Sequence, residues 1–407
     1  MIFFRKIVFW LHLGGGLFAG TVILIMSVTG VLLTYEKQLI AWDELPGISV
    51  PAGAAEPLPL RRLIGSVPGE PSSITIRPGS EAPVAFGFGR ESTVYVNPYT
   101  AELVEKESWG LRSFVRTMTA WHRWLGATGE GRATGRAITG ACNLVFLFLV
   151  GSGFYLWWPR QWKWSAARSV VWFRGGLHGK ARDFNWHNVI GFWCCAPLFL
   201  VVLSGAVISY PWMSDLVYRA AGDEPPKPSG LRGAGGSDGS RGGRGPEGGH
   251  GVRETAPPDL DGIEPLLARA SQASPGWRTI TFPVPRAGQE SVTFSIDRGS
   301  GGQPHLRSTL TLHRASGEVT GQETFAGNSP GRRARMILRF VHTGEVGGMA
   351  GQTIAGVASL GAVLLIYTGI ALATRRFAAW LARRRRADIA AGQARRSRER
   401  EPELQNR

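Results

Sequence analysis

The sequence has little cysteine. Of its 407 residues only three are cysteine, and Cys142, Cys194 and Cys195 all lie inside apolar segments. They follow no C-x-x-C spacing, so neither a disulfide framework nor a thiolate metal site can be derived from them. Such positions favour small apolar residues packed within helices.

Acidic residues are scarce relative to basic ones. The chain has 30 Asp and Glu against 46 Lys and Arg, which gives a net charge of +16. The basic residues cluster beside long apolar segments, which is typical of the cytoplasmic side of membrane spans rather than of a nucleic-acid surface. We therefore expect no nucleic acid partner. The basic clusters indicate topology and contact with anionic lipids, with a partner-binding tail as the alternative.

Four segments lack acidic and basic side chains apart from one histidine: 7–35, 137–158, 189–212 and 353–373. Each is long enough to cross a bilayer, which takes about 20 helical residues. The first is too long for a signal-peptide core and no small-x-small cleavage site follows it, so a retained anchor is expected. The sequence predicts an α-helical integral membrane protein with a four-transmembrane-helix bundle and both termini in the cytoplasm.

The segments between the spans contain short alternating runs with high strand propensity. These are "SSITIRPG" and "STVYVNP" in the first, and "WRTITFPVP", "SVTFSID" and "STLTLHR" in the second. Such runs are typical of half-buried strands in small α+β modules. A glycine-rich polar stretch within the second predicts a disordered linker.

These features divide the chain into segments. They are transmembrane helix 1 (1–36), outer module 1 (37–117), transmembrane helix 2 with an outer extension (118–158), a basic cytoplasmic loop (159–185), transmembrane helix 3 (186–212), outer module 2 (213–335) with a disordered insert (229–252), transmembrane helix 4 (336–374) and a basic cytoplasmic tail (375–407).

The two halves of the chain repeat one another. His12 precedes Gly30 by 18 residues, and His187 precedes Gly205 by the same interval. The second and fourth spans correspond too, because His122 and His342 each precede a glycine pair of this spacing, ending at Gly153 and Gly369. "TVYVNPYTAELV" also resembles "TLTLHRASGEVT". The sequence thus predicts an internal duplication of a unit consisting of helix, module and helix.

The predicted topology sorts the four histidines by depth. His12 and His187 begin helices that start in the cytoplasm, whereas His122 and His342 precede helices that start outside. An 18-residue step is five helical turns and about 27 Å, so each histidine shares a stripe with a glycine near the opposite face. One histidine pair is expected at each face of the membrane.

Paired imidazoles from different helices suit axial ligation of haem iron. We expect haem b, in two copies, with His12 and His187 as the iron ligands at the inner face. His122 and His342 would be the ligands at the outer face. Glycine leaves room for a porphyrin. Gly30 and Gly205 are assigned to the outer haem, and Gly153 and Gly369 to the inner one. Two haems at two depths would form an electron path across the bilayer.

Other roles for these residues remain open. A membrane histidine can also hydrogen-bond between helices or carry protons. Zinc is disfavoured because no Cys, Asp or Glu accompanies the histidines inside the spans. Trp157 and Trp193 are either interfacial anchors or neighbours of the inner haem. Four basic residues are either propionate partners or snorkelling helix ends. They are Arg123, Arg136, Lys180 and Arg182.

The motifs resemble the PepSY-associated transmembrane family of bacterial inner-membrane proteins. The stretches that carry the resemblance are "LHLGGGLFAG" with "SVTGVLLTYEK", "WHRWLG" with "GSGFYLWWPR", "NWHNVIGFW" with "LSGAVISYPW", and "VHTGEVGG" with "YTGIAL". "VNPYTAE" and "HRASGE" resemble the strand-turn-strand of PepSY modules. The resemblance implies periplasmic modules and matches the four histidines to the family's haem-ligand positions.

Some members of this family are ferric-siderophore reductases, so the resemblance implies an oxidoreductase with a ferric siderophore or other ferric chelate as partner. No G-x-G-x-x-G motif follows a strand, so we expect an external electron donor, either quinol or a cytoplasmic reductase. The catalytic residues are unknown. The alternatives are an electron-transfer subunit for a periplasmic oxidoreductase, a non-redox PepSY membrane protein, and a transporter whose histidines relay protons or metal ions.

Overall fold

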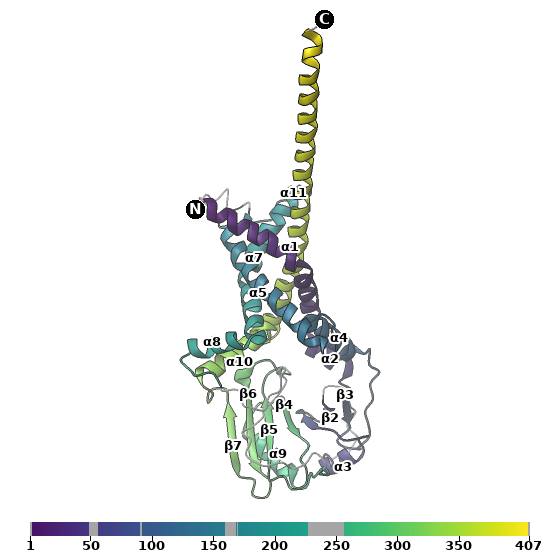
Figure 1. The fold of residues 1–407 in the computed structure, drawn as a ribbon. Helices are drawn as coiled ribbons and strands as arrows, with labels where there is room; N and C mark the ends of the chain where they lie inside the picture. The colour runs from purple at the N-terminus through teal and green to yellow at the C-terminus, as the bar shows by residue number, and fades with distance from the viewer. Residues whose placement is uncertain are drawn as a thin grey trace. The chain divides into compact units, whose positions relative to one another are not determined.

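The fold is shown in Figure 1 as a computed structural model that describes residues 2–48, 56–89, 92–158, 168, 170–226 and 256–405. The chain forms two compact units. The helical unit comprises Met1–Leu32, Met118–Ala206 and Ile354–Arg407, and the sheet unit comprises Leu33–Thr117 and Val207–Thr353. The insert expected at 229–252 lies outside the described residues.

The helical unit is built on helices that are long and apolar enough to cross a membrane. They are α1 (Ile2–Leu33), α5 (Gly131–Trp157), α7 (Gly179–Ser209) and α11 (Gly348–Gln405). Their most apolar windows have mean hydropathies between 1.8 and 2.2. The four candidate spans expected from the uncharged segments are confirmed. The helix α11 continues beyond its apolar part through the arginine-rich residues that follow.

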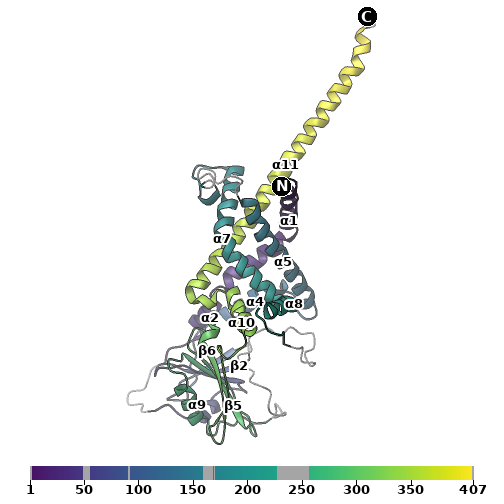
Figure 2. The same cartoon turned by 90° about the vertical axis from the view of Figure 1, so that its left-hand side faces the viewer.

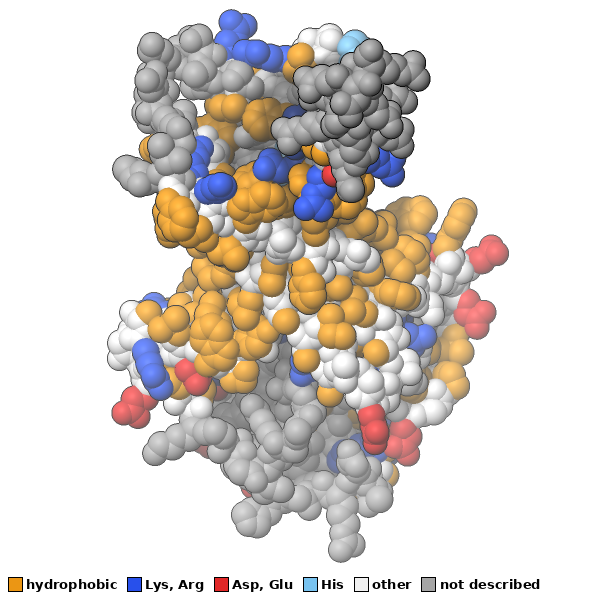
Figure 3. Space-filling model, turned by 45° about the horizontal axis from the view of Figure 1, so that its top comes forward, with side chains coloured by type: hydrophobic (Ala, Val, Ile, Leu, Met, Phe, Trp, Pro, Cys, Tyr) orange, Lys and Arg blue, Asp and Glu red, His pale blue; other side chains and the backbone are white. Residues whose placement is uncertain are grey.

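Large apolar side chains cover the outside of these helices. Phe18 is 86% exposed and Trp193 56% exposed, and Figure 3 shows hydrophobic side chains over much of the face it presents. An exposed apolar surface of this extent is unfavourable in water and suits hydrocarbon. The surface of the helical unit is therefore that of a membrane protein, suited to a lipid bilayer.

Small side chains let the helices pack closely inside the unit. Cys194 in α7 packs where Gly361 in α11 leaves no side chain, since a Cβ at that glycine would lie 2.4 Å from the cysteine sulfur. Cys142 is buried with Ala19 and Ile23 of α1. All three cysteines are free thiols in the structure, and two of them fill interhelical space.

The sheet unit contains one antiparallel sheet of seven strands. They are β1 (Ser73–Ile76), β2 (Val84–Phe88), β3 (Ser92–Val96), β4 (Thr279–Pro283), β5 (Ser291–Asp297), β6 (Arg307–His313) and β7 (Val319–Thr324). Their order is β3-β2-β1-β4-β5-β6-β7. The five strand-like runs noted in the sequence form β1, β3, β4, β5 and β6. The two modules share one sheet because β1 pairs with β4, with Ile74 opposite Phe282.

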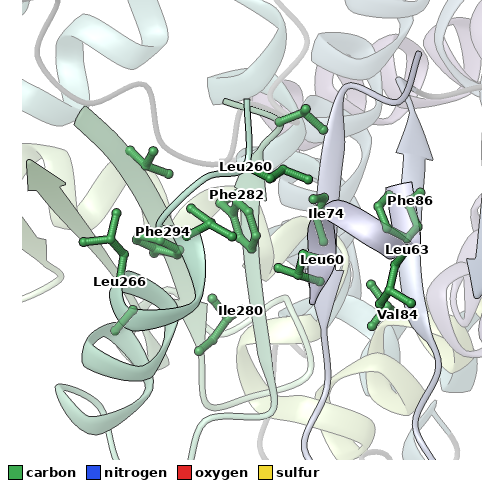
Figure 4. Packing of buried hydrophobic residues seen from close by; sticks show 14 of the residues in the cluster. Leu60, Leu63, Ile74, Val84, Phe86, Leu260, Leu266, Ile280, Phe282 and Phe294 are labelled. Carbon is green, nitrogen blue, oxygen red and sulfur yellow. The ribbon is translucent and has the colours of Figure 1, made fainter. Parts of the chain in front are cut away.

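One face of this sheet holds the hydrophobic core. The helices α3 (Leu60–Gly65) and α9 (Ile263–Gln272) contribute Leu63 and Ile263 to a cluster with Phe86, Phe282 and Phe294, and each of these side chains is at most 1% exposed (Figure 4). In both views of the ribbon α9 lies beside the strands (Figure 1, Figure 2). The order of one helix and three strands occurs twice, as α3-β1-β2-β3 and as α9-β4-β5-β6.

Shorter elements complete the sheet unit. They are α2 (Glu36–Glu44), α8 (Pro211–Ala220), the 3₁₀ turn η1 (Pro304–Leu306), α10 (Pro330–His342) and the 3₁₀ turn η2 (Glu345–Gly347). The helix α10 packs on α8, where Nε of Arg335 donates to Ser214 Oγ at 2.9 Å. The helix α4 (Leu111–Trp124) begins where the buried carboxylate of Asp43 accepts hydrogen bonds from the Trp109 and Leu111 amides.

A glycine forms the corner between α4 and α5. A Cβ at Gly135 would lie 2.2 Å from the carbonyl oxygen of Trp124, and the Thr139 hydroxyl donates to the Arg123 carbonyl at 3.0 Å. The same backbone-to-backbone approach occurs in the sheet unit, where a Cβ at Gly351 would lie 2.2 Å from the Gly344 oxygen. Both glycines begin the 18-residue glycine spacings that the sequence repeats. Their role is close packing of the turn that follows a histidine-bearing helix.

We expect Gly135→Ala to destabilise the protein by about 1–3 kcal/mol, because the added methyl group meets backbone that can move only with the whole α4 helix. The matched control is Gly151→Ala in the same helix, where a Cβ has nothing within 4 Å. Alanine there gains helix propensity and should leave stability equal or higher. Thermal unfolding of both variants in detergent measures the difference. Equal melting temperatures for the two would contradict the packing role.

Candidate functional site

Each membrane helix carries a serine or threonine directly followed by a glycine. These hydroxyl–glycine pairs are Thr29–Gly30 in α1, Ser152–Gly153 in α5, Ser204–Gly205 in α7 and Thr368–Gly369 in α11. All four hydroxyl residues are buried, with at most 7% exposure. Buried polar groups need hydrogen-bond partners, so each pair marks a polar point inside an apolar bundle.

A histidine from a different helix lies against three of these pairs. The distances from Nδ1 to the hydroxyl oxygen are 2.9 Å for His12 and Ser152, 3.0 Å for His122 and Thr29, and 3.0 Å for His187 and Thr368. Each distance is that of a hydrogen bond. The hydroxyl of each of these three pairs therefore contacts the Nδ1 edge of an imidazole ring.

The direction of these hydrogen bonds follows from the hydroxyl groups. Each one lies close to a carbonyl of its own helix, to which it can donate: Thr29 to Ile25 at 2.7 Å, Ser152 to Leu149 at 3.3 Å and Thr368 to Leu364 at 2.8 Å. A hydroxyl has one hydrogen, so a donating hydroxyl must accept from the imidazole. The proton of each ring is thereby assigned to Nδ1, and the lone pair lies on Nε2.

The glycine of each pair lets the imidazole approach the helix. A Cβ at Gly153 would lie 3.3 Å from His12 Cε1, and one at Gly369 would lie 3.4 Å from His187 Cε1. For Gly30 and His122 the distance is 3.6 Å. The sequence assigned these glycines to a porphyrin; in the structure each of the three faces the ring of a histidine. A larger side chain at any of them would displace the ring.

His12 and His187 belong to one local site in the helical unit. Both lie near the start of their helices, and their side chains are within electrostatic range of one another. Nδ1 hydrogen-bonds to a hydroxyl in both rings, to Ser152 in His12 and to Thr368 in His187. The structure thus brings together the residues predicted for the inner face, which are His12, His187, Gly153 and Gly369.

The residues predicted for the outer face are divided between the two units. His122 and Gly30 lie together in the helical unit, and Gly205 follows Ser204 there. The Ser204 hydroxyl is fully buried and donates to the Leu200 carbonyl at 2.7 Å, as in the other pairs. His342 is the last residue of α10 in the sheet unit. The pairing of His122 with His342 stays a prediction.

Open space adjoins the helix that carries His12. A Cβ at Gly14 or Gly16 would have nothing within 4 Å. An apolar groove of about 400 Å³ is lined by residues of α1 and α11, namely Leu24, Val363, Ile366, Tyr367, Ile370 and Ala371. Imidazoles held by hydroxyl partners inside an apolar helical bundle fit the ligation of haem iron.

The aromatic and basic residues considered in the sequence have other partners. The Trp157 indole donates to the Val170 carbonyl at 3.3 Å, and the Trp193 indole donates to the Val171 carbonyl at 3.0 Å. The two tryptophans thus bind adjacent carbonyls in the stretch just before α7. The guanidinium of Arg182 pairs with Asp183 at 2.8 Å.

The remaining basic candidates are also placed. The guanidinium of Arg123 lies 5.1 Å from the centre of the Trp124 ring. Arg136 lies in the first turns of α5, and Lys180 in the first turn of α7. The buried carboxylate of Asp183 also pairs with Arg375 of α11, at 3.0 Å. This ion pair joins the start of α7 to the end of the apolar part of α11.

Sequence reasoning missed the hydroxyl residues. The signal was present, since "SVTG", "GSG", "LSG" and "YTG" all place serine or threonine before the repeated glycine. The spacing identified the glycine but gave no role to the residue before it. In the described ranges no group of three or more His, Cys, Asp and Glu side chains lies close enough to hold a metal ion by itself.

Comparison with known families agrees with this arrangement. A family model described as the PepSY-associated TM region matches residues 9–376, a stretch that includes all four histidines and all four hydroxyl–glycine pairs. No curated protein matches the chain. Because the match covers nearly the whole chain, the protein belongs to the PepSY-associated transmembrane family.

Proposed function

We propose that this protein holds two haem b groups and reduces a periplasmic ferric siderophore or similar chelate. The observation that carries the proposal is the set of three imidazoles, each held through Nδ1 by a hydroxyl of another helix. A ring held in this way presents the nitrogen that ligates iron. The haem, when bound, supplies one-electron transfer.

The protein's own residues would bind and position the cofactor. His12 and His187 would hold the haem iron at the inner face, and His122 and His342 would hold it at the outer face. The hydroxyls fix ring orientation, and the glycines set the distance between ring and helix. The apolar walls exclude water, which favours a neutral imidazole over a charged one.

The basic residues support an orientation in the bacterial inner membrane with both termini in the cytoplasm. Arg375 and Arg376 follow the apolar part of α11, and Arg5 precedes that of α1. The guanidinium of Arg376 lies 5.0 Å from the centre of the Trp10 ring, a pairing typical of the membrane interface. In this orientation the sheet unit is periplasmic. The repeated order of helix and three strands supports an internal duplication.

Reduction would release iron because ferric and ferrous ions differ in their ligand preference. Hard, charged oxygen donors hold ferric iron strongly and hold the less charged ferrous ion more weakly. The electron would come from quinol or a cytoplasmic reductase. The chain's part in this chemistry is to hold the redox centres at two depths and to present the chelate to the outer one.

The experiment that tests this function is an optical spectrum of the detergent-purified protein, oxidised and then reduced with dithionite, with a haem count per chain. We expect a b-type spectrum and about two haems per chain. Anaerobic mixing of the reduced protein with a ferric siderophore should then reoxidise it and yield ferrous iron. Colourless protein after haem-supplemented expression would return the histidines to structural or transport roles. Haem without chelate reduction would favour an electron-transfer subunit.

We expect Thr368→Val to weaken haem binding at the inner site by about 10–100-fold, because the Nδ1–H of His187 loses its acceptor while side-chain volume is kept. Thr368→Ser keeps the hydroxyl and is the matched control. The protein is diluted, and the fraction of haem that stays bound is measured from the reduced optical spectrum. Equal retention in the valine and serine variants would show that the hydroxyl does not orient the ring.

A further inference from the structure

The sheet face opposite the hydrophobic core carries small and polar side chains. The register places one residue from each strand in a single row across the sheet: Tyr95, Ala85, Thr75, Thr281, Ser295, Thr309 and Glu323. Hydroxyls in this face bond to one another, with Thr75 Oγ1 2.9 Å from Thr281 Oγ1 and Thr293 Oγ1 2.9 Å from Thr311 Oγ1. No large aliphatic side chain stands in the row.

Arg77 lies on this face without an acceptor. It directly follows Ile76, whose side chain packs at the core, so strand alternation turns Arg77 to the polar face beside Thr75. Its Nη1 is buried and has no hydrogen-bond partner among the described residues. Burial raises the pKa of Tyr95, and the nearby charge of Arg77 opposes that rise, which places the two side chains close together.

Two other half-buried arginines of the sheet unit, Arg112 and Arg307, are paired with carboxylates. Arg112 donates from Nε to Glu44 at 2.7 Å and also reaches Thr93 on the polar face at 3.3 Å. Arg307 pairs with Asp297 at 3.2 Å. A buried guanidinium N–H without an acceptor carries an unrecovered desolvation cost, which a bound anion would remove. Arg77 is therefore poised to receive an acceptor from outside the chain.

We propose that Arg77, together with the hydroxyls of Tyr95 and Thr75, binds a carboxylate-bearing ferric chelate on the polar face of the sheet. The proposal rests on the proposed reductase function and names its substrate class. A guanidinium matches a carboxylate through two parallel hydrogen bonds. The neighbouring hydroxyls can donate to further chelate oxygens, and the adjacent β2 positions, Ala85 and Gly87, carry little or no side chain. A neutral chelate lacks the charge that Arg77 selects.

The test uses gallium(III) citrate, because gallium(III) keeps the charge of ferric iron and is not reduced, so binding is measured apart from electron transfer. Gallium citrate is titrated into the full-length protein in nanodiscs, and the heat of binding is measured by calorimetry. The measured affinity should weaken with added salt. Arg77→Gln should weaken it by roughly tenfold or more. Arg77→Lys should be intermediate, since it keeps the charge and loses the fork.

The matched control is Arg61→Gln, at an exposed arginine of the same unit that pairs with Asp261 at 2.7 Å; it should bind like the wild type. A neutral gallium trihydroxamate should bind equally to Arg77→Gln and to the wild type. The melting temperature of ligand-free Arg77→Gln should not fall, because an unpaired buried charge is removed. A lower melting temperature with unchanged citrate binding would assign Arg77 a structural role and overturn the proposal.

Two further outcomes separate the site from the reductase function. Protein that contains haem and reduces chelates, but binds gallium citrate no better than Arg77→Gln does, would retain the function and reject this site. Colourless protein that binds gallium citrate through Arg77 would retain the site and reject the reductase. Equal binding of metal-free citrate would show a carboxylate site that does not recognise the chelate, which also overturns the proposal.

Discussion

Replacement of His187 by alanine is expected to lower the haem content from about two to about one per chain. The ring is held between the Thr368 hydroxyl and the Gly369 backbone. One remaining histidine would hold haem iron far more weakly than two. The haem count and the reduced spectrum of the purified variant measure the loss.

The same experiment on His12→Ala should give the same spectrum, because both residues are assigned to one site. Added imidazole should restore haem binding in either alanine variant, since the missing ring leaves a space of its own size. His178→Ala is the matched control, because His178 lies in the segment before α7 and outside the apolar windows. Two haems retained in His12→Ala and in His187→Ala would falsify the ligand assignment.

Leucine at Gly369 is expected to remove the inner haem as completely as alanine at His187. A Cβ there already lies 3.4 Å from His187 Cε1, and the rest of the leucine side chain would push the ring out of line with its hydroxyl partner. Gly369→Ala should give an intermediate loss, because a methyl group fits after a shift of a few tenths of an ångström. Leucine at Gly153 acts on His12 in the same way, with the Cβ 3.3 Å from Cε1.

The control for these variants is Gly151→Leu, two residues from Gly153 on the same helix, where a Cβ meets nothing within 4 Å. It should keep both haems. Gly30→Leu should instead disturb the outer haem, because its Cβ would lie 3.6 Å from His122 Cε1. The midpoint potentials of the two haems, measured by optical redox titration, distinguish the sites. An equal effect of Gly30→Leu and Gly369→Leu on both haems would contradict the assignment of glycines to histidines.

The candidate site was predictable in part. Histidines in or beside uncharged segments and glycines at a repeated spacing identify His12, His187, Gly153 and Gly369 from local patterns. The depth expected of each histidine rests on the positions of the basic residues. The role of Ser152 and Thr368 could not be predicted, because it depends on contact with a histidine of another helix. The local sequence around a hydroxyl residue does not specify that contact.

The fold was predictable to a similar degree. Alternating runs identified five of the strands, whereas β2 contains Ala85 and Gly87 and β7 is largely polar, so neither shows a strong pattern. Two separate modules were expected from the repeat. Their union through β1 and β4 was not visible, because that pairing joins residues about two hundred positions apart and local propensity does not specify it.

The sequence by itself determined the four candidate membrane spans, the repeated histidine and glycine spacings and the four histidines, since each depends on the residue types within a stretch of chain. Only the tertiary structure decided which hydroxyl fixes which imidazole, which ring nitrogen keeps its lone pair, and which arginine lacks a partner. The physical reason is that hydrogen bonds and burial are properties of pairs of residues. Those pairs form when distant helices and strands pack together.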